Sequence, residues 1–130
     1  MKCPCCSGLN YEACCKLYHD GMPAPTPLAL MRSRYSAYAL KNADYIMRTT
    51  HPRNPNYERN RKKWSESILE FCNGTQFVKL EILETGPDTV KFAAHLKYPD
   101  RDFILEELSR FQKVDGQWYY LKAETSNRNS

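Results

Sequence analysis

The chain has 130 residues, of which 42% are hydrophobic and 26% charged, and its formal net charge is +4. These proportions are typical of a soluble globular protein, and the length allows one full domain plus a small appendage. No apolar run approaches the roughly 18 residues that cross a bilayer, and residues 1–20 lack the apolar core of an export signal. We therefore expect a cytoplasmic protein without membrane contact.

Five of the six cysteines lie within residues 1–15, which makes this segment the most unusual part of the chain. It holds too little apolar surface to pack by itself, so a metal or disulfides must stabilise it. In a reducing compartment clustered cysteines favour a metal, and four thiolates form a closed, structural zinc site. A disulfide framework is the alternative, and a thiolate site also accepts iron in place of zinc. Ser7 could donate a hydrogen bond to a sulfur, and we expect the ring of Tyr11 to cover the site.

Three prolines between residues 22 and 27 predict a stiff connector after the cysteine segment. We therefore expect residues 1–22 to form the appendage and residues 23–130 to form the main domain. Apolar spacing, helix starts and proline stops predict three helices, at residues 26–42, 43–50 and 54–74.

From residue 75 the hydrophobic period changes from about 3.6 to 2, which predicts antiparallel strands at residues 75–85, 90–98, 103–113 and 117–123. A polar, frayed tail is expected after them. The pair Asp115-Gly116 predicts a two-residue hairpin in which Val114 pairs with Gln117. The expected fold is α+β, with three N-terminal helices packed on a curved four-stranded antiparallel sheet and a small zinc-bound segment in front.

The pattern C-x-C-x-S-G-x2-Y-x2-C-C at residues 3–15 resembles the SEC-C metal-binding motif, known from the C-terminal tail of the Sec-pathway translocation ATPase. The resemblance implies that the metal ligands are Cys3, Cys5, Cys14 and Cys15. Cys6 stands where the motif usually has glycine, so it could substitute for Cys5 or remain a free thiol. His19 is a second possible substitute ligand, and the alternative is that it is an exposed polar residue.

A further resemblance covers nearly the whole chain. Residues 25–39, 50–52 and 109–120, together with Trp64, are similar to the YchJ family of small bacterial proteins. This resemblance implies that the main domain adopts the cone-shaped fold of nuclear transport factor 2 (NTF2). The order of helices followed by strands agrees with that fold, but the family resemblance by itself supplies no function.

The cone fold often places a ligand cavity between its sheet and its helices. Strand parity puts Glu107, Ser109, Phe111, Trp118 and Tyr120 on one face of the sheet. If this face lines a cavity, an acid–base site could form from the candidate residues His51, Glu107, Ser109, Arg32, Arg34, Tyr35, Trp64, Phe111 and Trp118. The alternative is a buried network in which Glu107 pairs with an arginine and the aromatic residues form core.

Two hypotheses of function follow from these features. In the first, the protein is a zinc-binding adaptor that contacts a protein partner through residues 1–22. By analogy with the SEC-C tail, this partner would be a chaperone or the ribosome. Residues 32–63 carry nine basic and two acidic side chains, a net charge of +7, which could meet an anionic or ribosomal partner or form a solvated helix face. In the second, the cone cavity holds a small ligand or an enzyme site. We prefer the first hypothesis, because no nucleophile–base pair or open metal site can be named from the spacing.

Overall fold

The computed structural model describes residues 1–129. In chain order its elements are the 3-10 helix η1 (Tyr11–Ala13), α1 (Cys15–His19), α2 (Pro27–Ala39), α3 (Ala43–Arg48), α4 (Arg61–Gly74), β1 (Gln76–Thr85), β2 (Thr89–Lys97), β3 (Asp102–Val114) and β4 (Gln117–Asn129). No helix within the described residues is long and apolar enough to cross a membrane.

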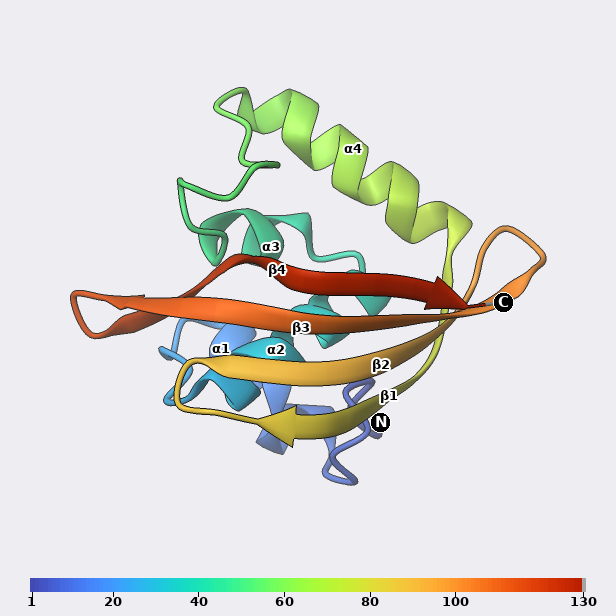
Figure 1. Cartoon of the computed structure of the whole chain (residues 1–130), viewed down its shortest axis with the longest axis horizontal. Coiled ribbons are helices and arrows are strands. Elements are labelled where there is room, and N and C mark those ends of the chain that lie inside the picture. Colours follow the sequence, from blue (N-terminus) through green and yellow to red (C-terminus); the bar gives the residue numbers. More distant parts are fainter. Residues whose placement is uncertain (130) are drawn as a thin grey trace.

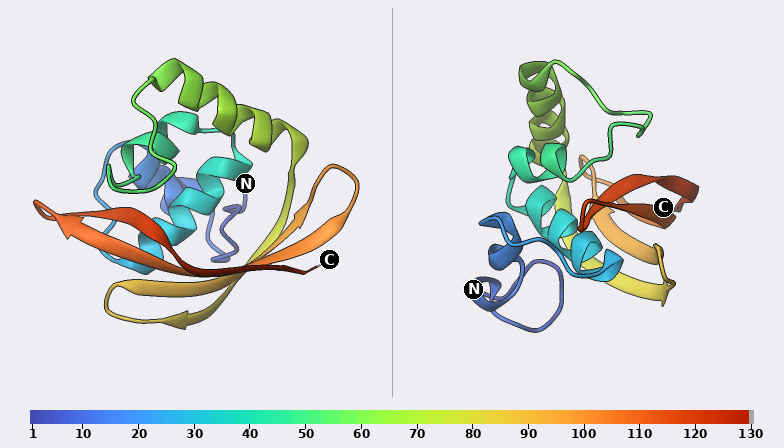
Figure 2. Two further views of the ribbon diagram at one scale, coloured as in Figure 1. Left: turned by 45° about the horizontal axis from the view of Figure 1, so that its top comes forward. Right: turned by 90° about the vertical axis from the view of Figure 1, so that its left-hand side faces the viewer.

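The four strands form one antiparallel sheet in the order β1-β2-β3-β4. The sheet is strongly twisted, and α2, α3 and α4 lie on one side of it (Figure 1, Figure 2). The cysteine segment lies beside α2, and the two short helices η1 and α1 within it were not predicted. The predicted α+β architecture, with helices on a curved four-stranded antiparallel sheet, is confirmed.

The starts of α2 and α3 follow from side-chain caps that can be recognised in the sequence. The Thr26 side chain accepts a hydrogen bond from the backbone N–H of Ala29 at 3.1 Å, and the Asn42 side chain accepts one from Tyr45 at 3.1 Å. Such caps satisfy N–H groups that have no partner inside the helix. Helix α2 ends at Ala39, close to its expected boundary.

The predicted start of the third main helix is wrong. We expected it to cover residues 54–74, but α4 begins only after Asn60, whose side chain accepts a hydrogen bond from the backbone N–H of Lys63 at 3.1 Å. The Asn54 side chain instead accepts a bond from the N–H of Asn56 at 2.8 Å. This local bond stabilises a turn. Asparagine side chains commonly form such bonds with the nearby backbone, and these bonds compete with helix formation.

The β3–β4 hairpin has the predicted register. Its two turn residues have positive φ angles, 50° at Asp115 and 82° at Gly116, as a tight hairpin turn requires. The cross-strand pairs are Val114 with Gln117, Lys113 with Trp118, and Phe111 with Tyr120.

The expected end of the last strand at residue 123 is wrong, because β4 continues to Asn129. Thr125 pairs with Leu108, and Asn129 pairs with Ile104. The polar sequence of this stretch suggested a frayed tail. In an edge strand, however, the backbone can pair with the neighbouring strand while polar side chains face solvent. Residue 130 of the expected tail lies outside the described residues.

The alternation predicted for β1 is interrupted by a bulge. The register passes from Phe77 opposite Leu96 to Lys79 opposite His95, which leaves Val78 without a partner and 61% exposed. A bulge adds one residue to one strand and therefore reverses the side-chain alternation locally. A strict alternation along the predicted strand at residues 75–85 therefore fails at Val78.

The core lies between the concave face of the sheet and the helices. Its buried side chains come from α2, α3, α4 and the sheet and include Leu30, Met31, Tyr35, Tyr45, Ile46, Trp64, Ile68, Cys72, Leu80, Val90, Phe92, Leu96 and Phe111. The sixth cysteine, Cys72, is thus a core residue.

Val90 and Val78 offer a matched test of this core, because one is fully buried and the other exposed. We expect Val90→Ala to lower the free energy of unfolding by about 2 kcal/mol through lost burial and an unfilled cavity. Val78→Ala should change it by less than about 0.5 kcal/mol. Urea unfolding with unchanged m-values measures both, and equal losses in the two variants would contradict this placement of the core.

Candidate metal centre and cavity

Four cysteine sulfurs gather in the N-terminal segment. The Sγ atoms of Cys3, Cys5, Cys14 and Cys15 all lie within 4.8 Å of one another, with Cys5 and Cys14 at 3.7 Å. Sulfurs at the corners of a tetrahedron with zinc–sulfur bonds of about 2.3 Å are about 3.8 Å apart. All six cysteines are free thiols rather than disulfides. The donor set therefore fits a four-coordinate metal ion.

The backbone brings the two cysteine pairs together through a short loop. Lys2 and Asn10 form an antiparallel bridge, and the N–H of Cys3 donates to the carbonyl oxygen of Leu9 at 2.9 Å. Between them Gly8 adopts a φ of 90°, which glycine tolerates without steric cost. The second cysteine pair lies next to the start of α1, so the loop and the helix start face each other.

Two neighbours of the cluster match their expected roles. Ser7 Oγ lies 3.3 Å from the Sγ of Cys14, which is hydrogen-bonding distance to a sulfur. Tyr11 packs against the buried cysteines and shields them from one side. Such outer contacts orient metal ligands and exclude water from the ion.

Cys6 lies outside the group of four sulfurs. It is exposed, and its Sγ accepts a hydrogen bond from the backbone N–H of Leu80 in β1 at 3.5 Å. Its φ angle is 65°, in the left-handed region that favours glycine. This backbone conformation explains why the SEC-C pattern has glycine at the position of Cys6.

His19 fits neither of the two roles that the sequence left open. One ring nitrogen, Nε2, lies 2.8 Å from the carbonyl oxygen of Ser33, and the other, Nδ1, lies 2.7 Å from Tyr11 Oη. A carbonyl can only accept, so Nε2 carries the proton and Nδ1 accepts from the tyrosine. Burial also lowers the pKa of His19. The half-buried, neutral imidazole joins α1 to α2, and both of its nitrogens have partners outside the group of four sulfurs.

The cysteine segment is held firmly against the main domain. Arg32 donates a hydrogen bond to the carbonyl oxygen of Cys5 at 2.7 Å, and the buried Ser36 Oγ lies 3.3 Å from the Sγ of Cys3. Arg48 donates to the carbonyl oxygen of His19 at 2.6 Å. Arg32, a cavity candidate in the sequence, therefore supports the metal segment instead.

The crowded thiols differ in their affinity for protons. The hydrogen bond with Cys15 lowers the pKa of Cys5 to about 4, and the same bond raises the pKa of Cys15. Burial raises the pKa of Cys14. An ion that binds all four sulfurs must displace the protons of the high-pKa thiols, so metal affinity falls as the pH falls.

A cavity of about 330 Å³ lies between the concave face of the sheet and the helices α2 and α4. Four of the residues predicted for a cavity site line it, namely Arg34, Tyr35, Glu107 and Ser109. They are joined there by Tyr120, whose hydroxyl donates a hydrogen bond to Glu107 Oε2 at 2.9 Å. Ser109 Oγ donates to the same oxygen at 2.5 Å.

Arg34 is 7% exposed and makes no ion pair with any residue that the structure describes. Its guanidinium carbon lies 4.7 Å above the centre of the Tyr120 ring. One of its nitrogens donates to the hydroxyls of Thr49 and Thr50, at 2.8 and 3.0 Å. The predicted buried network is thus present in altered form, because the partners of Glu107 are two hydroxyls and not an arginine.

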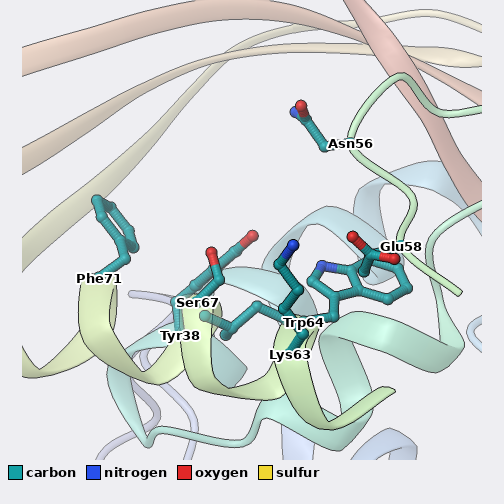
Figure 3. A pocket seen from close by; sticks show the side chains of 8 residues that line it. Tyr38, Asn56, Glu58, Lys63, Trp64, Ser67 and Phe71 are labelled. Carbon is teal, nitrogen blue, oxygen red and sulfur yellow. The ribbon is translucent and has the colours of Figure 1, made fainter. Parts of the chain in front are cut away.

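A second pocket of about 380 Å³ adjoins the first and shares Tyr38, Asn56 and Phe71 with it (Figure 3). Trp64, a candidate from the sequence, lines this pocket. Asn56 lies on the loop before α4, where we expected a helix, so sequence analysis could not place it beside a cavity.

The remaining candidates line neither pocket in the described part of the chain. The ring of His51 accepts a hydrogen bond from the N–H of Arg53 and helps to form the turn after α3. Phe111 is a core residue, and Trp118 packs against the core with Lys113 over its ring. His51 therefore does not line the cavity that holds Glu107.

The tyrosines give a test based on pH. Burial raises the pKa of Tyr11, Tyr35, Tyr38, Tyr45 and Tyr120, and for Tyr120 the nearby Glu107 carboxylate adds to this effect. These groups stay neutral in the folded chain at a pH where the unfolded chain ionises, so stability falls as the pH rises past about 10.

We expect Tyr120→Phe to flatten this decline by up to about 1.4 kcal/mol per pH unit, the contribution of one proton. Urea unfolding at a series of pH values between neutral and strongly alkaline measures the slope. The same slope in the variant and the parent protein would contradict a buried, neutral Tyr120.

Comparison with known proteins identifies the same two parts. The family model described as the YchJ middle NTF2-like domain matches residues 26–123. A UPF0225 protein of Deinococcus radiodurans is 45% identical over 123 residues, covering 93% of this chain and 87% of that protein. A UPF0225 protein of Streptomyces coelicolor is 38% identical over 130 residues and covers 94% of both.

Two solved structures extend the similarity to the cysteine segment. The solution structure of a SEC-C motif containing protein from Rhodopseudomonas palustris is 34% identical, with a TM-score of 0.79 over 98% of this chain and 100% of that chain. The crystal structure of a SEC-C motif containing protein from Psychrobacter arcticus is 31% identical, with a TM-score of 0.76 over 92% of this chain and 79% of that chain.

Proposed function

We propose that this chain, which belongs to the YchJ family, binds one structural zinc ion and uses the zinc-held segment to bind a protein partner. The observation that carries the proposal is the group of four sulfurs within 4.8 Å of one another, which lies inside a segment that has almost no core of its own. Four thiolates favour a closed tetrahedral zinc site, and such an ion stabilises the fold instead of activating a substrate.

The metal would hold rigid the surface that the segment presents to a partner. Four large apolar side chains of the segment are exposed to solvent, namely Met1, Leu9, Leu17 and Met22. Exposed apolar side chains commonly contact other proteins, and a rigid presentation lowers the entropy cost of binding. The bonds from Arg32 and Ser36 to the cysteine loop keep this surface fixed on α2.

Charge adds a second element to the proposed partner contact. Of the basic residues between positions 32 and 63, Arg34 is buried and Arg32 and Arg48 are bonded to the cysteine segment. The exposed cluster is smaller than the sequence suggested and lies at the start of α4, with Arg59, Arg61, Lys62 and Lys63. This cluster would steer an anionic partner such as the ribosome, whereas a chaperone would need the apolar segment alone.

The zinc site is tested by metal analysis of the full chain purified without chelator. We expect about one zinc per chain, loss of the metal in Cys14→Ser, and full retention in Cys6→Ser. Cys6 is the matched control because it is a neighbouring thiol outside the group of four. Iron in place of zinc would change the proposed ion, and full metal content in Cys14→Ser would contradict the ligand set.

Partner binding is tested with a photoreactive amino acid placed at Leu9 in the cysteine segment or at Leu83 in β1, since both side chains are exposed. We expect a discrete crosslinked protein from position 9 that disappears when Cys14→Ser is added, and none from position 83.

Sedimentation of the crosslinked product with or without ribosomes then separates the two partner classes. Crosslinks that form equally from both positions, or that survive the loss of the metal, would contradict the proposal.

A further inference from the structure

The cavity contains a polar group that lacks a partner. Tyr35 is 4% exposed, and its buried hydroxyl makes no hydrogen bond with any residue that the structure describes. An unsatisfied buried hydroxyl costs roughly 1–3 kcal/mol, and such groups are rare in native proteins. Tyr35 lines the cavity, so its side chain is part of the wall that a bound molecule would contact.

The same cavity holds one cation and one carboxylate that do not pair. Arg34 packs over the ring of Tyr120, and Glu107 accepts a hydrogen bond from that tyrosine's hydroxyl. Ser109 and Tyr120 both donate to Oε2 of Glu107, and a single nitrogen of Arg34 donates to one backbone carbonyl and two threonine hydroxyls. The Tyr38 hydroxyl is a further hydrogen-bond partner of Arg34. The other N–H groups of the guanidinium and one oxygen of the Glu107 carboxylate remain available to a ligand.

The other walls of the cavity are flat and apolar. Tyr38 stacks on Phe77 with ring centres 6.3 Å apart and planes inclined by 20°, and Tyr35 meets Phe77 edge-on at 5.8 Å. Phe71 from α4 and Leu105 from β3 complete this lining. Its volume of about 330 Å³ lies at the lower end of the range for small-molecule sites, about 300–1,000 Å³.

We propose that this cavity binds a planar, uncharged molecule with an amide-like edge, which accepts a hydrogen bond from Arg34 and donates one to Glu107. An anionic ligand would be attracted by Arg34 but repelled by the Glu107 carboxylate. A cationic ligand would be attracted by Glu107 but repelled by Arg34. A neutral edge that both accepts and donates satisfies both groups at once. This ligand site is separate from the partner-binding role of the metal segment.

The test uses three probes that differ only in this edge: 2-naphthamide, which is neutral, 2-naphthoate, which is an anion, and 2-naphthamidine, which is a cation. Each is titrated into the metal-loaded full chain while the backbone amide signals are followed by NMR. We expect 2-naphthamide to bind about tenfold more tightly than either charged probe, as the loss of one charge-assisted hydrogen bond implies. Shifts should centre on Tyr35, Glu107 and Tyr120.

Glu107→Gln replaces the carboxylate by an amide that can also donate. We expect it to raise the affinity of 2-naphthoate about tenfold relative to 2-naphthamide. Glu106→Gln is the matched control, since it makes the same charge change at the neighbouring residue, whose side chain lies 3.8 Å from Lys91 and does not line the cavity. The control should leave all three affinities unchanged.

Tyr35→Phe gives an independent test that does not depend on the charge pair. Removal of an unpartnered hydroxyl should raise the midpoint of thermal unfolding of the ligand-free chain, and a lower midpoint would show that the hydroxyl has a partner. Failure of all three probes to bind, or preference for a charged probe, would overturn the proposal.

Discussion

The N-terminal segment depends on four sulfur atoms that share one small volume. Its only buried cluster consists of Cys3, Cys5 and Cys15, with Tyr11 and Cys14 packed against it. So few apolar contacts cannot offset the entropy lost when some twenty residues become ordered, at roughly 1–2 kcal/mol for each backbone position. A metal ion bonded to four thiolates would supply the missing free energy in one place. The geometry of the segment is therefore a consequence of its ligand spacing.

Helix α2 connects this segment to the rest of the protein. One side of the helix presents Arg32 and Ser36 to the cysteine loop, while Arg34 and Tyr35 line the cavity. A helix that is buried on both sides cannot show a simple apolar stripe, and here its polar residues have structural partners on each side. The metal centre and the cavity therefore share one rigid support, although their chemistry differs.

Much of this arrangement could be predicted because local chemistry determines it. The hairpin follows from Asp115-Gly116 and the start of α2 from a threonine cap, whereas the group of four cysteines was implied by the resemblance to the SEC-C motif. The family comparisons confirm the YchJ resemblance and the NTF2-like domain.

The errors have a common physical origin in contacts between residues far apart in sequence. The bulge at Val78, the late start of α4 and the continuation of β4 depend on pairing or turn bonds that a one-dimensional pattern does not show. His51 illustrates the same limit, since its sequence position suggested a cavity residue but its ring completes a local turn.

The central claim is that four cysteine sulfurs, and no imidazole, hold a zinc ion in the folded chain. X-ray absorption at the zinc edge of the purified, metal-loaded protein tests it most directly. The structure predicts a single shell of four sulfur neighbours at about 2.3 Å from the zinc. A shell that contains nitrogen at about 2.0 Å would place a histidine such as His19 among the ligands and contradict the account.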